Sequence, residues 1–333
     1  MLLTPSGMSV DKSLTTERSS SHFEKKFIKC RKYKNSRFLA KGKFGAVYFA
    51  EDKNGRPIAA KVAIGSSKKL QKLIEREVNF MSSFEHPGII VLLCADIRHL
   101  HCFYTMEFAK GGNLNERFKT NKASEKCAQH IFKQIVQAVS YLHNEKKVIH
   151  HDIKADNVLL MSVDCFPVAK LTDFGLTATI VETKKHNVAS GSYRYKAPEK
   201  LKLQLRVSSD IKPCNEKVDI YAIGITLLGV LVAPIKPFKS KGKQLAEIES
   251  GKLLKRMLGQ LQMKKSKDLL SFFCRCLEIK EENRASADEL LRHPWLAVSC
   301  GTDKTCSDSS SSSDSGDRSD FSFSEDSASN CFL

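Results

Sequence analysis

The sequence predicts an α+β fold of two lobes, because a strand-rich part precedes a mostly helical part. From Arg37 to Val62, short alternating apolar segments are separated by glycines, which is typical of antiparallel strands. One segment with helical periodicity follows (KLQKLIEREVNFMSSF), and CFYTMEF then returns to a strand pattern. Beyond the glycines of KGGNL the pattern is mainly helical. We therefore expect an antiparallel sheet with one main helix, followed by a helical lobe.

Two segments dominate the helical part. Residues 127–143, CAQHIFKQIVQAVSYLH, have apolar side chains at every third or fourth position and predict an amphipathic helix. Residues 220–235, IYAIGITLLGVLVAPI, are apolar on all sides and follow Asp219. They fall short of the roughly 18 residues that a membrane span requires. We interpret this segment as a buried helix and expect no membrane span.

The two ends of the chain differ in composition from its centre. Residues 1–34 combine serine, threonine and basic residues, and we expect a flexible basic leader there. Residues 298–333 are rich in serine and aspartate with little apolar area, which predicts a disordered tail. Between them we expect one domain at 35–297, with a first lobe at 35–108 and a second at 109–297.

The charge of the chain indicates its partners, and its cysteine content indicates its compartment. The net charge is +17, although the last 32 residues carry seven acids and only two bases. The remainder is therefore strongly basic, which favours contacts with acidic proteins or nucleic acid, unless its lysines are simply solvated. The eleven cysteines are scattered, and the N-terminus lacks the order of a signal peptide. We expect an intracellular protein, in cytoplasm or nucleus, with reduced thiols.

Residues 39–51, LAKGKFGAVYFAE, place two glycines and a phenylalanine at the tip of an expected hairpin. Glycines let backbone N–H groups approach phosphate oxygens closely, because no Cβ intervenes. Glycine-bearing hairpins are also common without any ligand. This segment alone therefore leaves both interpretations open.

Lys61 lies in the apolar strand IAAKVA, where an unpaired ammonium group would be unfavourable. Glu77, on the following helix, is the partner that we expect. A purely structural salt bridge is the alternative interpretation. Because buried ion pairs contribute little to stability, the pair favours a functional use.

Eight features of the sequence occur in one order and carry a family resemblance. They are AKGKFGAV, Lys61, Glu77, HHDIKADN, DFG at 173–175, APE at 197–199, Asp219 and Arg284. With these features, the stretch from about Arg37 to Trp295 resembles the eukaryotic-type protein kinase family. The resemblance implies the bilobal protein kinase fold and transfer of the ATP γ-phosphate to serine or threonine hydroxyls of protein substrates, with Mg²⁺ as cofactor.

The resemblance assigns catalytic roles to a few polar residues. Asp152 would accept the proton of the substrate hydroxyl, and Lys154 would neutralise the γ-phosphate. Lys61, held by Glu77, would bind the α- and β-phosphates. Asn157 and Asp173 would be the magnesium ligands, since this ion prefers hard oxygen donors. Lysine in DIKADN, together with Ser192, is typical of the serine/threonine type.

A larger set of residues is assigned to ATP itself. The glycine-bearing loop would cover the phosphates, and the end of CFYTMEF with the residues after it would contact the adenine edge. Apolar members of the set would enclose the ring, although ordinary core packing would also explain them. The set is Leu39, Ala40, Gly42, Phe44, Gly45, Val47, Ala59, Lys61, Met106, Glu107, Ala109 and Leu159. Ala40 replaces a glycine of the family, and we expect only a modest loss of nucleotide affinity.

His151 is the second departure from the family, which has arginine there to dock a phosphate of the activation segment, here 173–199. Arginine grips phosphate with a charged fork, whereas histidine is mostly uncharged near neutral pH. The sequence therefore predicts an enzyme that is active without phosphorylation of this segment. Alanine at its candidate sites should leave activity nearly unchanged; these sites are Thr177, Thr179, Thr183 and Ser190.

Two alternatives belong to other functional classes. A pseudokinase or scaffold would bind nucleotide or a partner without chemistry, but dead kinases commonly lose one of the residues that phosphoryl transfer needs, and all of them are present here. A nucleic-acid-binding protein lacks a supporting motif, so such contacts would be an accessory property. We expect a monomer. Its acidic tail is a candidate substrate of the chain itself, or of another kinase.

Overall fold

The computed structural model describes residues 33–42, 45–63, 67–97, 102–186, 188, 190–207, 212–232, 238–261 and 266–297. The predicted tail, nearly all of the leader and Phe44 lie outside the described residues. The chain divides into two units. The first runs to Ser83 and also contains Ile90–Ala109; the second contains Phe84–Ile89 and the chain from Lys110 onward.

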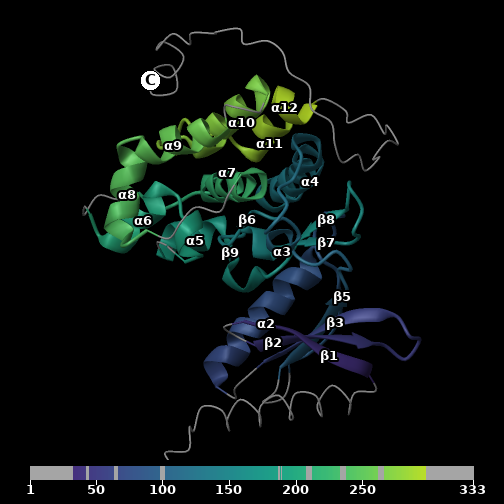
Figure 1. The fold of residues 1–333 in the computed structure, drawn as a ribbon. Coiled ribbons are helices and arrows are strands. Elements are labelled where there is room, and N and C mark those ends of the chain that lie inside the picture. Colours follow the sequence, from purple (N-terminus) through teal and green to yellow (C-terminus); the bar gives the residue numbers. More distant parts are fainter. Residues whose placement is uncertain are drawn as a thin grey trace, which may run out of the picture. The chain divides into compact units, whose positions relative to one another are not determined.

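The first unit contains a five-stranded antiparallel sheet with the order β1-β2-β3-β5-β4 (Figure 1). Its strands are β1 (Lys34–Lys41), β2 (Gly45–Glu51), β3 (Pro57–Ala63), β4 (Leu92–Asp96) and β5 (Phe103–Glu107). Only β3 and β5, which neighbour each other in the sheet, are separated in sequence by a helix, α2 (Lys68–Ser83). This helix buries side chains at helical spacing, namely Ile74, Glu77, Val78 and Met81.

One face of this sheet forms a compact apolar core. Because side chains alternate between the two faces of a strand, residues two apart point the same way. Tyr48 pairs with Ala60 across β2 and β3, and both are fully buried. The buried cluster on this face consists of Ala46, Tyr48, Ala50, Ile58, Ala60, Val62 and Phe103. The opposite face of β2, β3 and β5 therefore carries the other set of residues, which includes Lys61.

The second unit is mostly helical. The predicted amphipathic helix is α4 (Glu125–Asn144), which begins where the Ser124 side chain accepts a hydrogen bond from the N–H of Cys127. The predicted buried helix is α7 (Lys217–Leu231), and almost all its residues are buried. It contacts α4, α3 (Leu114–Arg117) and α10 (Lys267–Leu277), so it forms the centre of this unit (Figure 1).

Short elements of the second unit complete it. Two strand pairs join β6 (Val148–Ile149) to β9 (Ala178–Thr179) and β7 (Val158–Leu160) to β8 (Ala169–Leu171). Because β6 and β7 flank HHDIKADN while β8 and β9 flank DFG, these pairings bring the two motifs together. The remaining helices are α5 (Ile180–His186), α6 (Pro198–Leu205), α8 (Lys241–Glu249), α9 (Lys252–Leu261), α11 (Ala287–Leu291) and α12 (Pro294–Ala297). Single 3-10 turns are η1 (Ala155–Asn157), η2 (Phe174–Leu176) and η3 (Tyr193–Tyr195).

The fold class predicted from the sequence is confirmed. The chain has an α+β fold, with an antiparallel sheet and one main helix in the first unit and mainly helices in the second, as the resemblance implied. Within the described ranges, no helix is both long and apolar enough to cross a membrane.

Candidate active site

In the first unit, Lys61 and Glu77 form a buried ion pair. Lys61 Nζ donates to both carboxylate oxygens of Glu77, at 2.9 and 3.0 Å. Tyr104 Oη donates to Glu77 Oε1 at 2.9 Å. Burial, followed by the negative charge of Glu77, raises the pKa of Tyr104 well above its usual value, so its hydroxyl stays a donor. The Glu77 carboxylate is therefore fixed from two sides and holds the ammonium group in place.

Tyr104 was not among the residues predicted from the sequence. It pairs directly with Lys61 across β3 and β5, and directly opposed residues of antiparallel strands share one face. The strand register was therefore the signal that would have revealed it. Sequence alone does not give that register, because a shift by one residue would move Tyr104 to the other face.

Several predicted nucleotide residues share the face of the sheet that carries Lys61. Val47 pairs with Lys61, and Ala59 pairs with Met106. Ala59 and Met106 are buried, while Val47 is half-buried. This face lies opposite the apolar core cluster, and the structure brings these predicted residues together on it.

The predicted residues of the glycine-bearing loop are distributed along β1 and β2. Leu39 and Ala40 are exposed on β1, and Ala40 does not have the positive φ that would require glycine. The N–H of Gly42 donates to the carbonyl of Gly45 at 2.8 Å. A Cβ at Gly45 would lie only 2.4 Å from the carbonyl oxygen of Val62, so packing against β3 already requires this glycine. A Cβ at Gly42 would make only ordinary contacts within the described residues.

Three other predicted nucleotide residues lie at separate places. Glu107 ends β5, and both its N–H and its side chain bond to the backbone of Val91. Ala109, which is 9% exposed, is the last residue of the first unit. Leu159 is half-buried on β7 of the second unit.

In the second unit, Asp152 lies at the centre of a small hydrogen-bond network. Its Oδ2 accepts from Lys154 Nζ at 2.8 Å, and its Oδ1 accepts from the N–H of Ser192 at 2.7 Å. Burial by itself raises the pKa of Asp152, but the bonds from Lys154 and Ser192 outweigh it and hold the pKa below its usual value. Asp152 is therefore an ionised carboxylate in a fixed orientation.

Lys154 bridges two groups. Besides Asp152, its Nζ donates to Ser192 Oγ at 2.9 Å, and the lysine side chain remains 20% exposed. The structure thus brings the two residues typical of the serine/threonine type into direct contact. The ammonium group is held at the carboxylate, and the side chain that carries it is partly exposed.

Asn157 and Asp173 are the predicted magnesium ligands. Asn157 Nδ2 donates to the Asp152 carbonyl at 2.8 Å, which turns the amide oxygen away from that contact. Thr172, the neighbour of Asp173, donates its N–H to the Asn157 carbonyl at 3.0 Å and links the two segments. Asp173 adopts the left-handed conformation with φ 64°, which is uncommon outside glycine.

An amide oxygen and a carboxylate fit magnesium, which commonly uses one or two protein ligands together with water and phosphate oxygens. Among the described residues there is no group of three or more histidine, cysteine, aspartate and glutamate side chains that could hold a metal alone. Asn157 and Asp173 therefore remain the predicted ligands of the ion.

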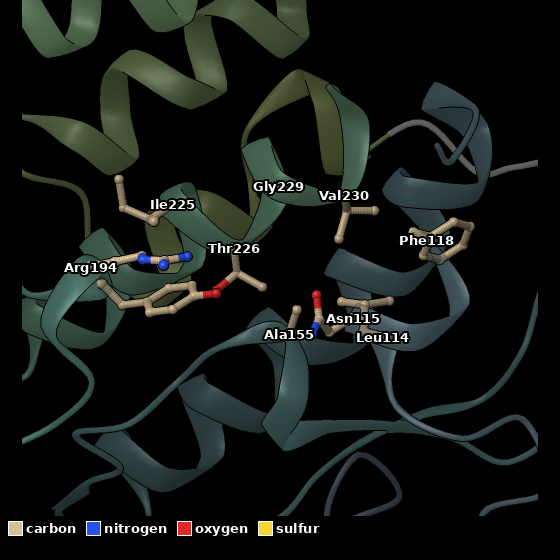
Figure 2. A pocket seen from close by; sticks show the side chains of 10 residues that line it. Leu114, Asn115, Phe118, Ala155, Arg194, Ile225, Thr226, Gly229 and Val230 are labelled. Carbon is tan, nitrogen blue, oxygen red and sulfur yellow. The ribbon is translucent and has the colours of Figure 1, made fainter. Parts of the chain in front are cut away.

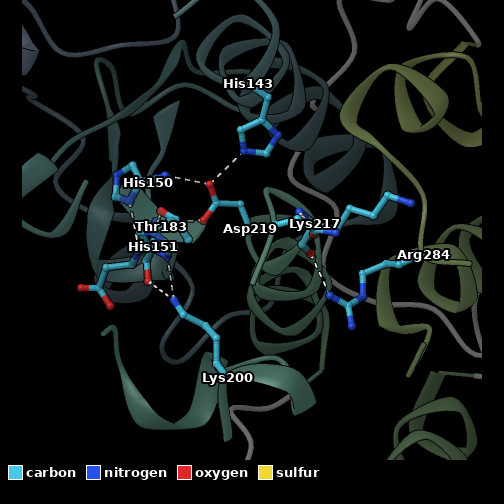
Figure 3. Close-up of polar contacts among 10 residues, drawn as sticks. His143, His150, His151, Thr183, Lys200, Lys217, Asp219 and Arg284 are labelled. Atoms are coloured by element: carbon cyan, nitrogen blue, oxygen red, sulfur yellow. Dashed lines mark hydrogen bonds and ion pairs between the residues drawn. The ribbon is translucent and has the colours of Figure 1, made fainter. Parts of the chain in front are cut away.

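Asp219, in the first turn of α7, anchors the loop that carries Asp152 (Figure 3). Its oxygens accept from the N–H groups of His150 and His151, at 2.8 and 2.9 Å, and from His143 Nε2 at 3.0 Å. Burial raises the pKa of Asp219, but the hydrogen bond from His143 counts among the causes that outweigh it, and the pKa lies far below the usual range. A buried carboxylate thus fixes the backbone immediately before Asp152.

His151 is buried and contacts the activation segment directly (Figure 3). Burial, followed by the positive charge of Lys200, lowers its pKa from 6.5 to about 3, so the ring is neutral. Nδ1 lies 3.1 Å from Lys200 Nζ, and Nε2 lies 3.0 Å from Thr183 Oγ1. Since an ammonium can only donate, Nδ1 is the acceptor and Nε2–H donates to Thr183.

Lys200 was not predicted as part of this site. It lies on α6, is 3% exposed, and also donates to the His151 carbonyl at 3.2 Å. No sequence pattern distinguishes it from other lysines, because its role depends on burial beside a distant loop. The nearby Glu199 forms two bonds with Arg284, at 2.6 and 3.0 Å, which anchor the end of the activation segment.

The chain is similar to known protein kinases over most of its length. The protein kinase domain family model matches residues 33–296. Serine/threonine-protein kinase PEPKR2 of Arabidopsis thaliana is 33% identical over 270 residues, which cover 79% of this chain and 53% of that protein. Probable serine/threonine-protein kinase mkcD of Dictyostelium discoideum is 28% identical over 275 residues, 80% of this chain and 40% of that protein.

An Aurora kinase of Candida glabrata is 32% identical over 267 residues, covering 78% of this chain and 69% of that protein. The chain spans about half the length of the first two relatives. The family match extends through both units and contains every feature of the site described above. The chain therefore belongs to the protein kinase family.

Proposed function

We propose that this chain is an ATP-dependent serine/threonine protein kinase, with its kinase domain at 35–297. The observation that carries this proposal is the network in which Lys154 and Ser192 hold the ionised Asp152. A carboxylate of fixed orientation next to an accessible ammonium suits a hydroxyl group that must lose a proton while it attacks a phosphate. The names of the relatives support the same activity.

Asp152 would accept the hydrogen of the substrate serine or threonine, because its lowered pKa keeps it ionised at neutral pH. Lys154 would neutralise charge on the transferred phosphoryl group from its place between Asp152 and Ser192. Phosphoryl transfer depends mainly on positioning and charge neutralisation, and both groups are already oriented.

Lys61 would bind the α- and β-phosphates of ATP, in an orientation that Glu77 and Tyr104 maintain. Magnesium, held by Asn157 and Asp173, would supply further neutralisation of phosphate charge when bound. The twelve residues that the sequence assigns to ATP, of which Leu39 is the first and Leu159 the last, remain the proposed nucleotide-binding residues. These roles rest on family membership and on the donor chemistry of the residues.

A mixed peptide library with serine or threonine acceptors, incubated with labelled ATP and Mg²⁺, tests the activity. Asp152→Asn and Lys61→Met should each reduce phosphate transfer at least about a hundredfold. The matched controls Asp164→Asn and Lys53→Met change exposed residues and should retain wild-type rates. ATP binding without any transfer by the wild-type chain would instead identify a pseudokinase.

We further propose that activity does not depend on phosphorylation of the activation segment. Thr183 is fully buried and bonded to the neutral His151, which Lys200 holds in turn. This direct hydrogen bond attaches the segment to the catalytic loop. Because Thr183 makes this contact, alanine there removes a bond, and Thr183 must be tested apart from Thr177, Thr179 and Ser190.

We also propose the oligomeric state, the compartment and the substrate class. The chain would be a monomer in cytoplasm or nucleus, and it would act on proteins. The strongly basic remainder of the chain supports additional contacts with acidic proteins or nucleic acid. Sedimentation of the chain with and without an acidic peptide would test both points. A dimer that persists at all salt concentrations would contradict the monomer. Identical sedimentation with and without the peptide would contradict binding of acidic partners.

A further inference from the structure

Tyr104 contacts both members of the buried ion pair in the first unit. It lies on β5 directly opposite Lys61 of β3, and it is 2% exposed. Its hydroxyl donates to Glu77 Oε1, on α2, at 2.9 Å. Lys61 Nζ lies 5.4 Å from the centre of the Tyr104 ring, close enough for attraction between the cation and the ring. One side chain of the sheet therefore contacts the carboxylate through its hydroxyl and the ammonium through its ring.

A buried hydroxyl need not connect two elements. Thr226, labelled in Figure 2, is 1% exposed on α7. Its hydroxyl donates to the Ala222 carbonyl at 2.7 Å, one turn earlier in the same helix, which satisfies it locally. The Tyr104 hydroxyl instead bonds from a strand to a helix. Its removal would loosen α2 from β5, whereas removal of the Thr226 hydroxyl would affect one helix only.

The bond from Tyr104 holds the carboxylate independently of the ammonium. In the proposed function, Lys61 binds the phosphates of ATP, whose negative charges attract the ammonium away from Glu77. Burial raises the pKa of Tyr104, so its hydroxyl stays protonated and continues to donate. Hydrogen bonds to a charged acceptor are stronger than those between neutral groups. Glu77 Oε1 therefore keeps a fixed position while Lys61 is shared between the carboxylate and phosphate.

A second polar contact holds α2 to the sheet. Gln71 Nε2 donates to the carbonyl of Ile97, immediately after β4, at 3.0 Å. Gln71 and Glu77 are about 9 Å apart along the helix axis, since each residue of an α-helix rises about 1.5 Å. Ile74, between them, is buried. A shift of α2 along its axis, or a rotation about it, would therefore break polar contacts at two positions.

We propose that Tyr104 is a positioning residue for ATP, because its hydroxyl holds α2 against β5 and so keeps Lys61 where it binds phosphate. This inference rests on the proposed kinase function and deepens it by adding a residue that acts through Glu77 and Lys61. The ion pair would be formed before ATP arrives. Binding would then not have to move α2, and a site that is already ordered loses less entropy when a ligand binds.

Steady-state kinetics with varied ATP and a saturating serine peptide test the proposal. Tyr104→Phe removes the hydroxyl and keeps the ring opposite Lys61, and kcat/KM for ATP should fall about tenfold. Thr226→Val is the matched control, because it removes a buried hydroxyl that bonds within one helix, and kcat/KM should stay within about twofold of wild type. A Tyr104→Phe variant with wild-type kcat/KM for ATP would overturn the proposal.

Combination with Lys61→Met separates positioning from a purely structural role. If Tyr104 acts through Lys61, adding Tyr104→Phe to Lys61→Met should change the residual kcat/KM for ATP by less than about twofold. A general defect of the sheet would instead lower the rate of both backgrounds equally. A loss of about tenfold in the Lys61→Met background as well would therefore overturn the assignment of Tyr104 as a positioning residue.

Amide hydrogen exchange of α2 needs no phosphate transfer and separates this inference from the proposed function. In the full chain without nucleotide, Tyr104→Phe should speed exchange of the amides around Glu77 at least about threefold, whereas Thr226→Val should leave them unchanged. This result would support the attachment of α2 even if the chain phosphorylated nothing. Unchanged exchange in Tyr104→Phe would overturn the attachment and leave the kinase activity of the wild-type chain standing.

Discussion

Two buried aspartates of the second unit, Asp152 and Asp219, have contrasting partners. Asp219 is 1% exposed and accepts hydrogen bonds from two backbone N–H groups and a buried histidine. Asp152 is 7% exposed, and one of its partners is the accessible ammonium of Lys154. Both carboxylates are ionised, but only Asp152 has a partner that a substrate can reach. A carboxylate bound to backbone N–H groups orders the loop, whereas one bound to an accessible lysine is available for chemistry.

The largest expected effect is on stability and concerns Asp219. Asp219→Asn replaces an acceptor oxygen by an NH₂ group that faces donors, and it should lower the free energy of unfolding by about 3 kcal/mol. Asp152→Asn should change it by less than about 1 kcal/mol while abolishing most activity. Urea unfolding and peptide phosphorylation, measured on both variants, check this contrast. Equal stability losses in the two variants would remove the distinction between the aspartates.

The pH dependence of stability tests whether His151, whose backbone N–H donates to Asp219, is neutral in the folded chain. The folded pKa of His151, about 3, lies below the unfolded value of 6.5, so the folded state binds fewer protons. The stability that neutral His151 contributes is therefore fully present above pH 6.5 and is lost as the pH falls from 6.5 toward 3. Between pH 7 and pH 5 this amounts to about 2 kcal/mol. His151→Gln cannot titrate and should show a correspondingly smaller loss in unfolding experiments at the two pH values; an identical loss would contradict a neutral His151.

The contrast between the aspartates also shows what the sequence could predict. The motifs identified Asp152, Lys154 and Asn157 because phosphoryl transfer requires these groups at close spacing. The helical and strand patterns predicted the fold class, since the apolar residues of α4 and of the sheet follow regular periods. These features are local, or depend on the order of motifs along the chain.

The partners that orient these groups could not be predicted in the same way. His143 and Lys200 act through contacts between segments far apart in the sequence. The periodicity of α4 places His143 on its buried face but does not give its partner, and no pattern indicates the burial of Lys200. Tyr104 depends on strand register, which the sequence does not give. Burial converts ordinary polar residues into positioning residues, and burial of a single polar residue is what periodicity does not reveal.

A smaller expected effect concerns Ser192, a partner of Asp152 through its N–H and of Lys154 through its hydroxyl. Ser192→Ala removes only the hydroxyl contact and should lower kcat about fivefold, corresponding to about 1 kcal/mol. Ser192→Thr retains a hydroxyl and should keep at least half of wild-type kcat. The pair of variants isolates the hydroxyl, which contacts Lys154 and also helps to lower the pKa of Asp152, because both variants preserve the backbone bond to Asp152. A loss of similar size in the threonine variant would show that packing, not hydrogen bonding, is responsible.

The smallest expected effect is that of replacing three hydroxyl residues of the activation segment. If His151 and Thr183 attach the activation segment directly, replacing Thr177, Thr179 and Ser190 together by alanine should change kcat/KM by less than about threefold. Thr183→Val, which keeps the shape but removes the hydroxyl, leaves the His151 Nε2–H without its acceptor and should destabilise the segment by about 1–3 kcal/mol. Peptide kinetics of phosphatase-treated wild type and of both variants compare the two effects. A hundredfold loss in the triple variant, with Thr183→Val unaffected, would mean that a phosphate rather than the His151 contact organises the segment. We expect the opposite result, a larger effect of Thr183→Val than of the triple variant. A buried hydrogen bond from His151 would then order the activation segment, as the buried carboxylate of Asp219 orders the catalytic loop.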